Sequence, residues 1–127
     1  NPLYGKVKDI NGNKVKIETA DGDYLSTMNE NNKLSVGDDS IAFVRPESLF
    51  IPRDGDNFDN IVEVNIESFE FEGNLKNFYA NLKSGAKIKF SVPNAIDTSS
   101  ITSGSKIELG FESSKSIILP KAPLAID

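Results

Sequence analysis

Residues 34–52 read LSVGDDSIAFVRPESLFIP, and a weaker copy of this stretch, ITSGSKIELGFESSKSIILP, occupies residues 101–120. Each copy has a polar turn with a glycine, a strand of alternating apolar residues, a polar corner and a second short apolar run that ends in proline. A sequence that repeats one unit of strand, corner and strand predicts two related β modules that pack against each other.

The polar corners of the two copies differ in sequence. The first corner consists of Arg45, Pro46 and Glu47, and the second is the Glu-Ser-Ser of residues 112–114. Because proline fixes φ and has no N–H, Pro46 predicts a turn that ends strand pairing. The opposite charges beside it either brace the corner or form a polar contact with another subunit, and the residues alone leave both open.

The rest of the chain predicts short β-strands separated by turns. Asn-Gly at 11–12 is a strong hairpin signal. Residues 61–71 form the longest alternating run, with a change of phase near Ser68 that predicts a bulge or bend. Residues 95–100 are the one place where a short helix is plausible, and a loop is the alternative. The predicted strands form a three-stranded meander over 3–27, lie near 40–44, 48–51, 61–71, 78–82 and 87–92, and return in the second copy of the repeated unit.

These strands predict an all-β fold of two related OB-like β-barrel modules with little helix. Residues 52–60 are rich in proline, glycine and acidic side chains and form the best linker between the modules. We therefore expect the first module over residues 1–53 and the second over residues 54–127. The second module would end in a tail after Pro120.

The composition limits the chemistry that the chain can perform. Among its 127 residues there is no cysteine and no histidine, so disulfides, thiolate metal sites and the commonest general base are excluded. The sequence also lacks the GxxxxGK[ST] phosphate-binding loop and the GxSxG nucleophile motif. We expect no catalytic residue, no metal ligand and no bound cofactor in this chain, which therefore would not be an enzyme by itself.

The charge and hydropathy also limit the partners. A net charge of −5 argues against nucleic acid as a partner, because that interaction needs cationic side chains to neutralise phosphates. Lysines do gather within residues 6–16 and 83–89, where alternate strand positions favour a solvated face over a functional basic patch. No apolar run is long enough for a membrane-spanning helix, and the first residues do not resemble a signal peptide.

Four segments in order resemble the TOBE-type C-terminal regulatory domain of the ATP-binding subunits of bacterial ABC importers. The resemblance covers nearly the whole chain, and its most recognisable part is the glycine turn that leads to Val-Arg-Pro-Glu. The four segments are NPLYGKV at 1–7, VGD to VRPE at 36–47, the hairpins from Glu-Gly to Val-Pro-Asn at 72–94, and the terminal strands at 104–120.

This resemblance implies a non-catalytic regulatory and dimerisation domain that tunes ATP-driven solute import. ATP and Mg²⁺ would bind to an ATPase domain that precedes Asn1 in the same polypeptide. The implied partners are that ATPase domain, a second copy of the subunit and, indirectly, the membrane subunits. The protein would lie in the cytoplasm at the inner face of the membrane. Among these importers, the sequence most resembles the subunits that import polyamines such as spermidine and putrescine, or ferric iron, and we favour the polyamine type.

The sequence leaves a second hypothesis open, in which the chain is a free-standing OB-like module that binds a small ligand or an oxyanion. The barrel-like pattern and the scattered lysines motivate it. Under the first hypothesis, we expect Arg45, Pro46 and Glu47 to be interface or regulatory residues.

Overall fold

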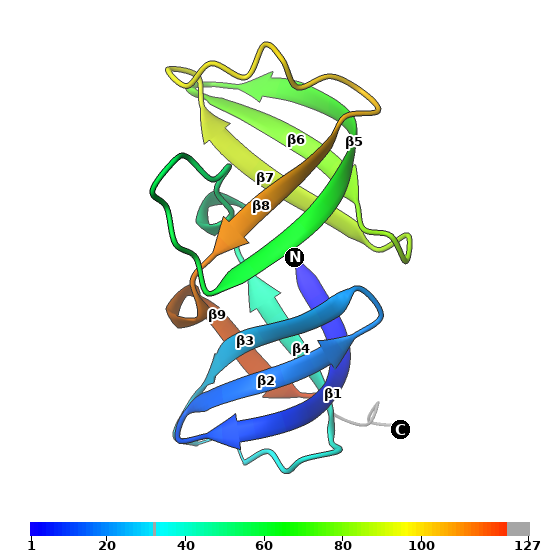
Figure 1. The fold of residues 1–127 in the computed structure, drawn as a ribbon, viewed down its shortest axis with the longest axis vertical. Coiled ribbons are helices and arrows are strands. Elements are labelled where there is room, and N and C mark those ends of the chain that lie inside the picture. The colour runs from blue at the N-terminus through cyan, green and yellow to red at the C-terminus, as the bar shows by residue number, and fades with distance from the viewer. Residues whose placement is uncertain (32, 122–127) are drawn as a thin grey trace.

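The structure of the chain is a computed structural model that describes residues 1–31 and 33–121. It confirms the predicted all-β class, because these residues contain nine strands and two short 3₁₀ turns, arranged as two lobes (Figure 1). The strands are β1 (Pro2–Asn11), β2 (Lys14–Thr19), β3 (Gly22–Met28), β4 (Asp39–Val44), β5 (Asn60–Glu72), β6 (Leu75–Asn81), β7 (Lys87–Pro93), β8 (Lys106–Phe111) and β9 (Ser116–Pro120), and the turns are η1 (Pro46–Ser48) and η2 (Ser113–Lys115).

One lobe is a closed barrel with the strand order β1-β2-β3-β9-β4. The last strand of the chain, β9, pairs in parallel with β3 and antiparallel with β4, and so closes the barrel. Side chains alternate as a half-buried strand requires: Val15 and Ile17 on β2 are fully buried, whereas Lys14 is exposed. Closure reduces the strand edge that this lobe leaves unpaired, although β3 and β9 pair over only Thr27 and Met28.

The other lobe is a four-stranded sheet with the order β7-β6-β5-β8, so the second OB-like module is a half-barrel. Its core includes Phe78 and Phe90, whose rings stack with centroids 4.9 Å apart. Phe50 extends the sheet with a single bridge to Gly110 on β8. The prediction of a strand at 48–51 is therefore wrong. The N–H groups of residues 48 and 49 donate to carbonyls of the η1 turn and are not free for a ladder.

The two lobes repeat one another strand by strand. The first strands, β1 and β5, carry bulges at corresponding positions, Lys8 and Glu67, and the second confirms the change of phase predicted near Ser68. The fourth strands, β4 and β8, each run into a 3₁₀ turn through an extended residue, Arg45 or Glu112. The repeated unit of the sequence is thus a repeated unit of structure.

Each half passes its last segment to the other half. After η1 the chain leaves the barrel and Phe50 joins the second sheet, and after η2 the chain leaves that sheet and β9 enters the barrel. The division into residues 1–53 and 54–127 stays a prediction about domains, but the sheets do not follow it fully. The barrel needs β9 because β3 and β4 would otherwise leave backbone groups unpaired between them.

The remaining segments are loops. Residues 95–100 form turns and not a helix, and they are closed by the hydrogen bond from the N–H of Ile101 to the carbonyl of Thr98 (2.9 Å). The tail predicted after Pro120 lies outside the described residues from position 122 onward. Over the part of the chain that the structure describes, no helix has the length and apolar character needed to cross a membrane.

Candidate functional site

The corner predicted to be an interface site lies at η1. Arg45 is the extended residue that leads into the turn, Pro46 is its first residue, and the side chains of Arg45 and Glu47 are exposed. Within residues 1–31 and 33–121 neither charged group forms an ion pair. The two charges thus do not brace the corner, and both are accessible to a partner. Their role as regulatory residues stays a prediction.

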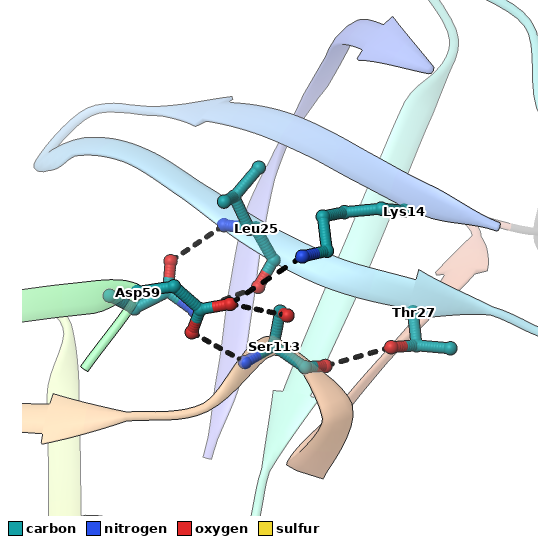
Figure 2. Close-up of polar contacts among 6 residues, drawn as sticks. Lys14, Leu25, Thr27, Asp59 and Ser113 are labelled. Atoms are coloured by element: carbon teal, nitrogen blue, oxygen red, sulfur yellow. Dashed lines mark hydrogen bonds and ion pairs between the residues drawn. The ribbon is translucent and has the colours of Figure 1, made fainter. Parts of the chain in front are cut away.

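The other corner, η2, is tied to the preceding loop and to the barrel by hydrogen bonds (Figure 2). The N–H of Ser113 donates to Oδ1 of Asp59 (2.8 Å), and its hydroxyl donates to Oδ2 (2.6 Å). The carbonyl of Ser113 accepts a hydrogen bond from the hydroxyl of Thr27 on β3 (2.9 Å). Nζ of Lys14 lies 3.8 Å from the Asp59 carboxylate. A single serine thus contacts both halves of the chain.

The ionisation of Asp59 reflects these contacts. Partial burial would raise the pKa of its carboxyl, but the hydrogen bonds from Ser113 and the charge of Lys14 outweigh that effect and lower the pKa below its usual value. Asp59 is therefore a carboxylate at neutral pH, when it accepts both hydrogen bonds.

Two asparagines hold the lobes together in the same way. Nδ2 of Asn60, at the start of β5, donates to the carbonyl of Leu25 on β3 (2.8 Å), and its Oδ1 accepts from the Leu25 N–H (2.7 Å). Asn1, immediately before β1, makes the same pair with the backbone of Lys89 on β7 (2.7 and 2.8 Å). Each clamp covers backbone groups of the third strand of the opposite half, which reduces the exposed strand edge.

A buried hydroxyl pair completes the polar contacts near η2. The hydroxyls of Ser26 on β3 and Ser116 on β9 lie 2.7 Å apart, and both side chains are inaccessible to solvent. At the corresponding place after η1 the chain has Leu49, which is also buried. We call the two corners, the two asparagine clamps and this serine pair the seam.

A hollow of about 300 Å³ opens at the seam beside Asn1. Lys87 and Lys89 reach it from β7 and Tyr79 from β6. Glu67 lines the same hollow. Nζ of Lys87 lies 2.9 Å from one of its carboxylate oxygens, whereas Lys89 forms no ion pair within the described residues. The lysine group predicted to be a solvated face at 83–89 therefore supplies two cations to the rim of a concave site.

A second hollow, of about 260 Å³, lies at the far end of the sheet, where Lys76 is already engaged. Its Nζ lies 4.0 Å from the centroid of the Phe69 ring and donates to the hydroxyl of Thr98 (3.0 Å). The carboxylate of Asp97 lines the same hollow, and the hydrogen bond from the Ser99 N–H lowers its pKa. The lining of this hollow has one lysine and one acid, whereas the lining of the hollow at the seam has two lysines and one acid, so this hollow suits an anion less well.

Comparison with known proteins identifies the family. Residues 42–119 match the model of the TOBE domain family, which is more than half of the chain. This chain belongs to the TOBE domain family. The predicted TOBE resemblance is confirmed at that level, and the matched segment includes both corners of the seam. Comparison of this TOBE domain with curated proteins finds no match.

Among solved structures, the TOBE domain is similar to the cytoplasmic molybdate-binding protein ModG in its PEG-grown form with molybdate bound. The TM-score is 0.78, the sequence identity is 19%, and the match covers 94% of this chain and 96% of that chain. At this identity the likeness shows the fold, and it confirms the two OB-like modules.

The sequence did not reveal most residues of the seam. Asp59 and Asn60 lie at the end of residues 52–60, whose polar composition and lack of periodicity predict a linker. Ser113 stood in a corner without a proline. One sequence signal could have indicated the role of Asn60. Asn1 and Asn60 stand at equivalent positions, each at the start of the first strand of its half.

Proposed function

We propose that this TOBE domain binds a small oxyanion in the hollow at the seam. The likeness to a molybdate-binding protein over nearly the full length of both chains supports this class of ligand. The observation in this chain that carries the proposal is the concave site at Asn1 with Lys87 and Lys89 on its rim. Ligand sites in proteins occur preferentially where two modules meet.

The chemistry of the hollow fits an anion with several acceptor oxygens. Lysine ammonium groups supply donors that also carry charge. Because Lys87 is paired with Glu67, Lys89 is the lysine of this hollow that has no ion pair within residues 1–31 and 33–121. The Tyr79 hydroxyl already donates its proton to Glu70 (2.5 Å), so in this arrangement it cannot also donate a hydrogen bond to a bound anion. Lys89 is therefore the residue on which binding should depend most.

Isothermal titration of the 127-residue chain with molybdate and with sulfate tests the proposal. We expect binding that weakens with salt and that falls at least tenfold in the Lys89→Ala variant. Lys83→Ala removes the same charge from an exposed position outside the hollow and should leave affinity unchanged. Absence of oxyanion binding to the unaltered chain, or equal losses in both variants, would contradict it.

A second candidate function is the regulatory and dimerisation role in an ABC importer ATP-binding subunit, with polyamine import favoured. Membership of the TOBE family supports it, together with the exposed charges of Arg45 and Glu47 beside Pro46, which form no ion pair in the part of the chain that the structure describes. ATP and Mg²⁺ would then bind to an ATPase domain of the same polypeptide, which would lie at the inner face of the cytoplasmic membrane and act with a second copy and the membrane subunits.

Two measurements separate the candidates. Titration with spermidine in place of molybdate tests the polyamine preference. Glu47→Lys in a polypeptide that includes an ATPase domain should alter the regulation of ATP hydrolysis if the corner is regulatory. Unchanged hydrolysis and unchanged regulation would remove the support that the corner gives to this second function.

A further inference from the structure

The hollow at the seam has an acidic residue in its lining as well as two lysines. This residue, Glu67, is the extra residue of the β5 bulge, where the register of β5 on β6 shifts between Ile66 and Ser68. A bulge redirects the side chain of its extra residue, and bulges are frequent beside ligand sites. The hollow that should attract an anion therefore also contains a group that repels one.

The carboxylate of Glu67 is held by an ion pair, but that pair does not use all of its acceptor capacity. Nζ of Lys87 donates to Oε1 of Glu67 (2.9 Å). A carboxylate has about four lone-pair sites on its two oxygens, so a single donor leaves most of them available. The side chains of Lys87 and Glu67 are 72% and 42% exposed, so solvent reaches the pair. Glu67 can therefore accept a further hydrogen bond from a molecule in the hollow.

The barrel contains the same ion pair with its charges reversed. Lys8 is the extra residue of the β1 bulge, and its Nζ lies 2.7 Å from the carboxylate of Asp23 on β3. Asp23 stands two residues before Leu25, which one asparagine clamp binds. Lys87 stands two residues before Lys89, which the other clamp binds. An ion pair between the bulge and the third strand is therefore common to both halves, whereas the lysine beside the clamp is replaced by leucine in the barrel.

The hydroxyl of Tyr79 gives the hollow a second acceptor. Tyr79 lines the hollow from β6, and its hydroxyl donates to the carboxylate of Glu70 (2.5 Å). This hydrogen bond raises the pKa of Tyr79, so the hydroxyl keeps its proton at neutral pH. A hydroxyl oxygen whose proton is already donated can still accept a hydrogen bond. The hollow thus combines cations with two groups that accept hydrogen bonds.

We propose that the hollow prefers an oxyanion that keeps a proton at neutral pH, such as hydrogen phosphate, over sulfate and molybdate, which keep none. This preference rests on the proposed function, because it concerns the same hollow. An oxyanion with a proton donates its O–H to Glu67 while its other oxygens accept hydrogen bonds from Lys89. An oxyanion without a proton must place a bare oxygen against the carboxylate of Glu67. Repulsion of this kind is a common source of specificity against a competing ligand.

The charge of the anion alone does not produce this preference. In mildly alkaline buffer, hydrogen phosphate, sulfate and molybdate are all tetrahedral and carry the same double negative charge, and only hydrogen phosphate has an O–H group. A difference in affinity therefore reports the proton. The hollow is open to solvent, so we expect a preference of about tenfold, which corresponds to one hydrogen bond to a charged group. Larger factors require polar groups that are fully buried.

Isothermal titration of the 127-residue chain with hydrogen phosphate, sulfate and molybdate, at one ionic strength, tests the preference. Glu67→Gln replaces the carboxylate by an amide that can donate. The preference should then disappear, mainly because sulfate and molybdate bind more tightly. Glu63→Gln is the matched control, since Glu63 is an exposed acidic residue of the same strand and is not among the residues that line the hollow. It should leave the preference unchanged.

Tyr79→Phe removes the second acceptor and should reduce the preference by about threefold, as expected for a hydrogen bond between neutral groups. Circular dichroism confirms that each variant is folded. Sulfate or molybdate that binds the unaltered chain as tightly as hydrogen phosphate, or a preference that survives Glu67→Gln, would overturn this inference and leave the proposed function standing. Binding of none of the three anions would contradict the proposed function, and the preference with it.

Discussion

Corner η1 and corner η2 follow the same backbone path but are held by opposite kinds of interaction. In η1 the turn is set by the fixed φ of Pro46 and followed by the buried side chain of Leu49. In η2 the corresponding residues are Ser113 and Ser116, both buried and both hydrogen-bonded to residues outside the turn. The same backbone turn is thus held by a fixed φ and an apolar side chain in η1, and by hydrogen bonds in η2.

This difference shows where the two halves depend on each other. A proline turn needs no partner, and among the described residues the charged side chains of Arg45 and Glu47 form no ion pair. A serine turn has an N–H and a hydroxyl that require acceptors, and it finds both on Asp59. The junction around η2 should therefore be more sensitive to substitution than the junction around η1.

The largest change in stability should come from adding a methyl group to a glycine. Gly5 in the closed barrel and Gly110 in the open sheet differ in the atoms that this methyl group would meet. A Cβ at Gly5 would lie 2.1 Å from the carbonyl oxygen of Glu18, which is backbone of the neighbouring strand. The three atoms nearest to a Cβ at Gly110 would all belong to the ring of Phe58, which lies in a loop. We expect Gly5→Ala to lower the free energy of unfolding by about 3 kcal/mol and Gly110→Ala by about 1 kcal/mol.

Urea denaturation measures both values. The matched double variant Gly110→Ala with Phe58→Ala should recover part of the cost of the first change, because the obstructing ring is removed. Equal costs at the two glycines would mean that the barrel wall yields as easily as the loop.

The next effect separates the two asparagine clamps. Asn60 is 3% exposed, and its loss leaves the N–H and carbonyl of Leu25 without their partner, so Asn60→Ala should cost about 2 kcal/mol. Asn1 is more exposed, and water can replace it at Lys89, so Asn1→Ala should cost about 1 kcal/mol. Hydrogen exchange should quicken at the Leu25 amide in the first variant and at the Lys89 amide in the second.

These clamps also show what the sequence could and could not predict. Alternation of apolar residues identified most strands, and the change of phase near Ser68 identified a bulge, because both depend on local spacing. The pattern could not show that β9 enters the barrel. Alternation reports which face of a strand is buried, not which edge it pairs with.

The seam was hidden for a related reason. Asp59 and Asn60 bond to residues far away in the chain, and no local spacing encodes such contacts. The repeated stretch already places Arg45 and Glu112 at corresponding corners, but the contacts that hold the second corner become visible only in the structure.

A smaller effect should appear in acid. The pKa of Asp59 is lowered from its ordinary value of 3.8, so its contribution to stability is present above that value and is lost as the pH falls through the lowered pKa. Asp59→Asn should remove this part of the acid sensitivity. The Ser113 amide shift in an NMR titration should follow Asp59 in the unaltered chain and stay constant in the variant.

Asp97 provides the internal control for this titration, because its pKa is also lowered and its hydrogen bond to Ser99 lies away from the seam. The Ser99 amide should titrate in both proteins. A Ser113 amide that still titrates in Asp59→Asn would show that another group governs the η2 junction.

The smallest effect should be that of Arg45, and comparison with Ser113 distinguishes the two corners. Arg45 is exposed and unpaired within the described residues, so Arg45→Ala should change the free energy of unfolding by no more than about 0.5 kcal/mol. Ser113→Ala removes one hydrogen bond to a carboxylate and should cost about 1 to 2 kcal/mol. Both measurements require a protein concentration low enough for monomers, because self-association would add to the apparent stability. A cost at Arg45 that persists on dilution would mean that the charge stabilises its own corner, and a cost that disappears on dilution would place Arg45 in a contact between copies.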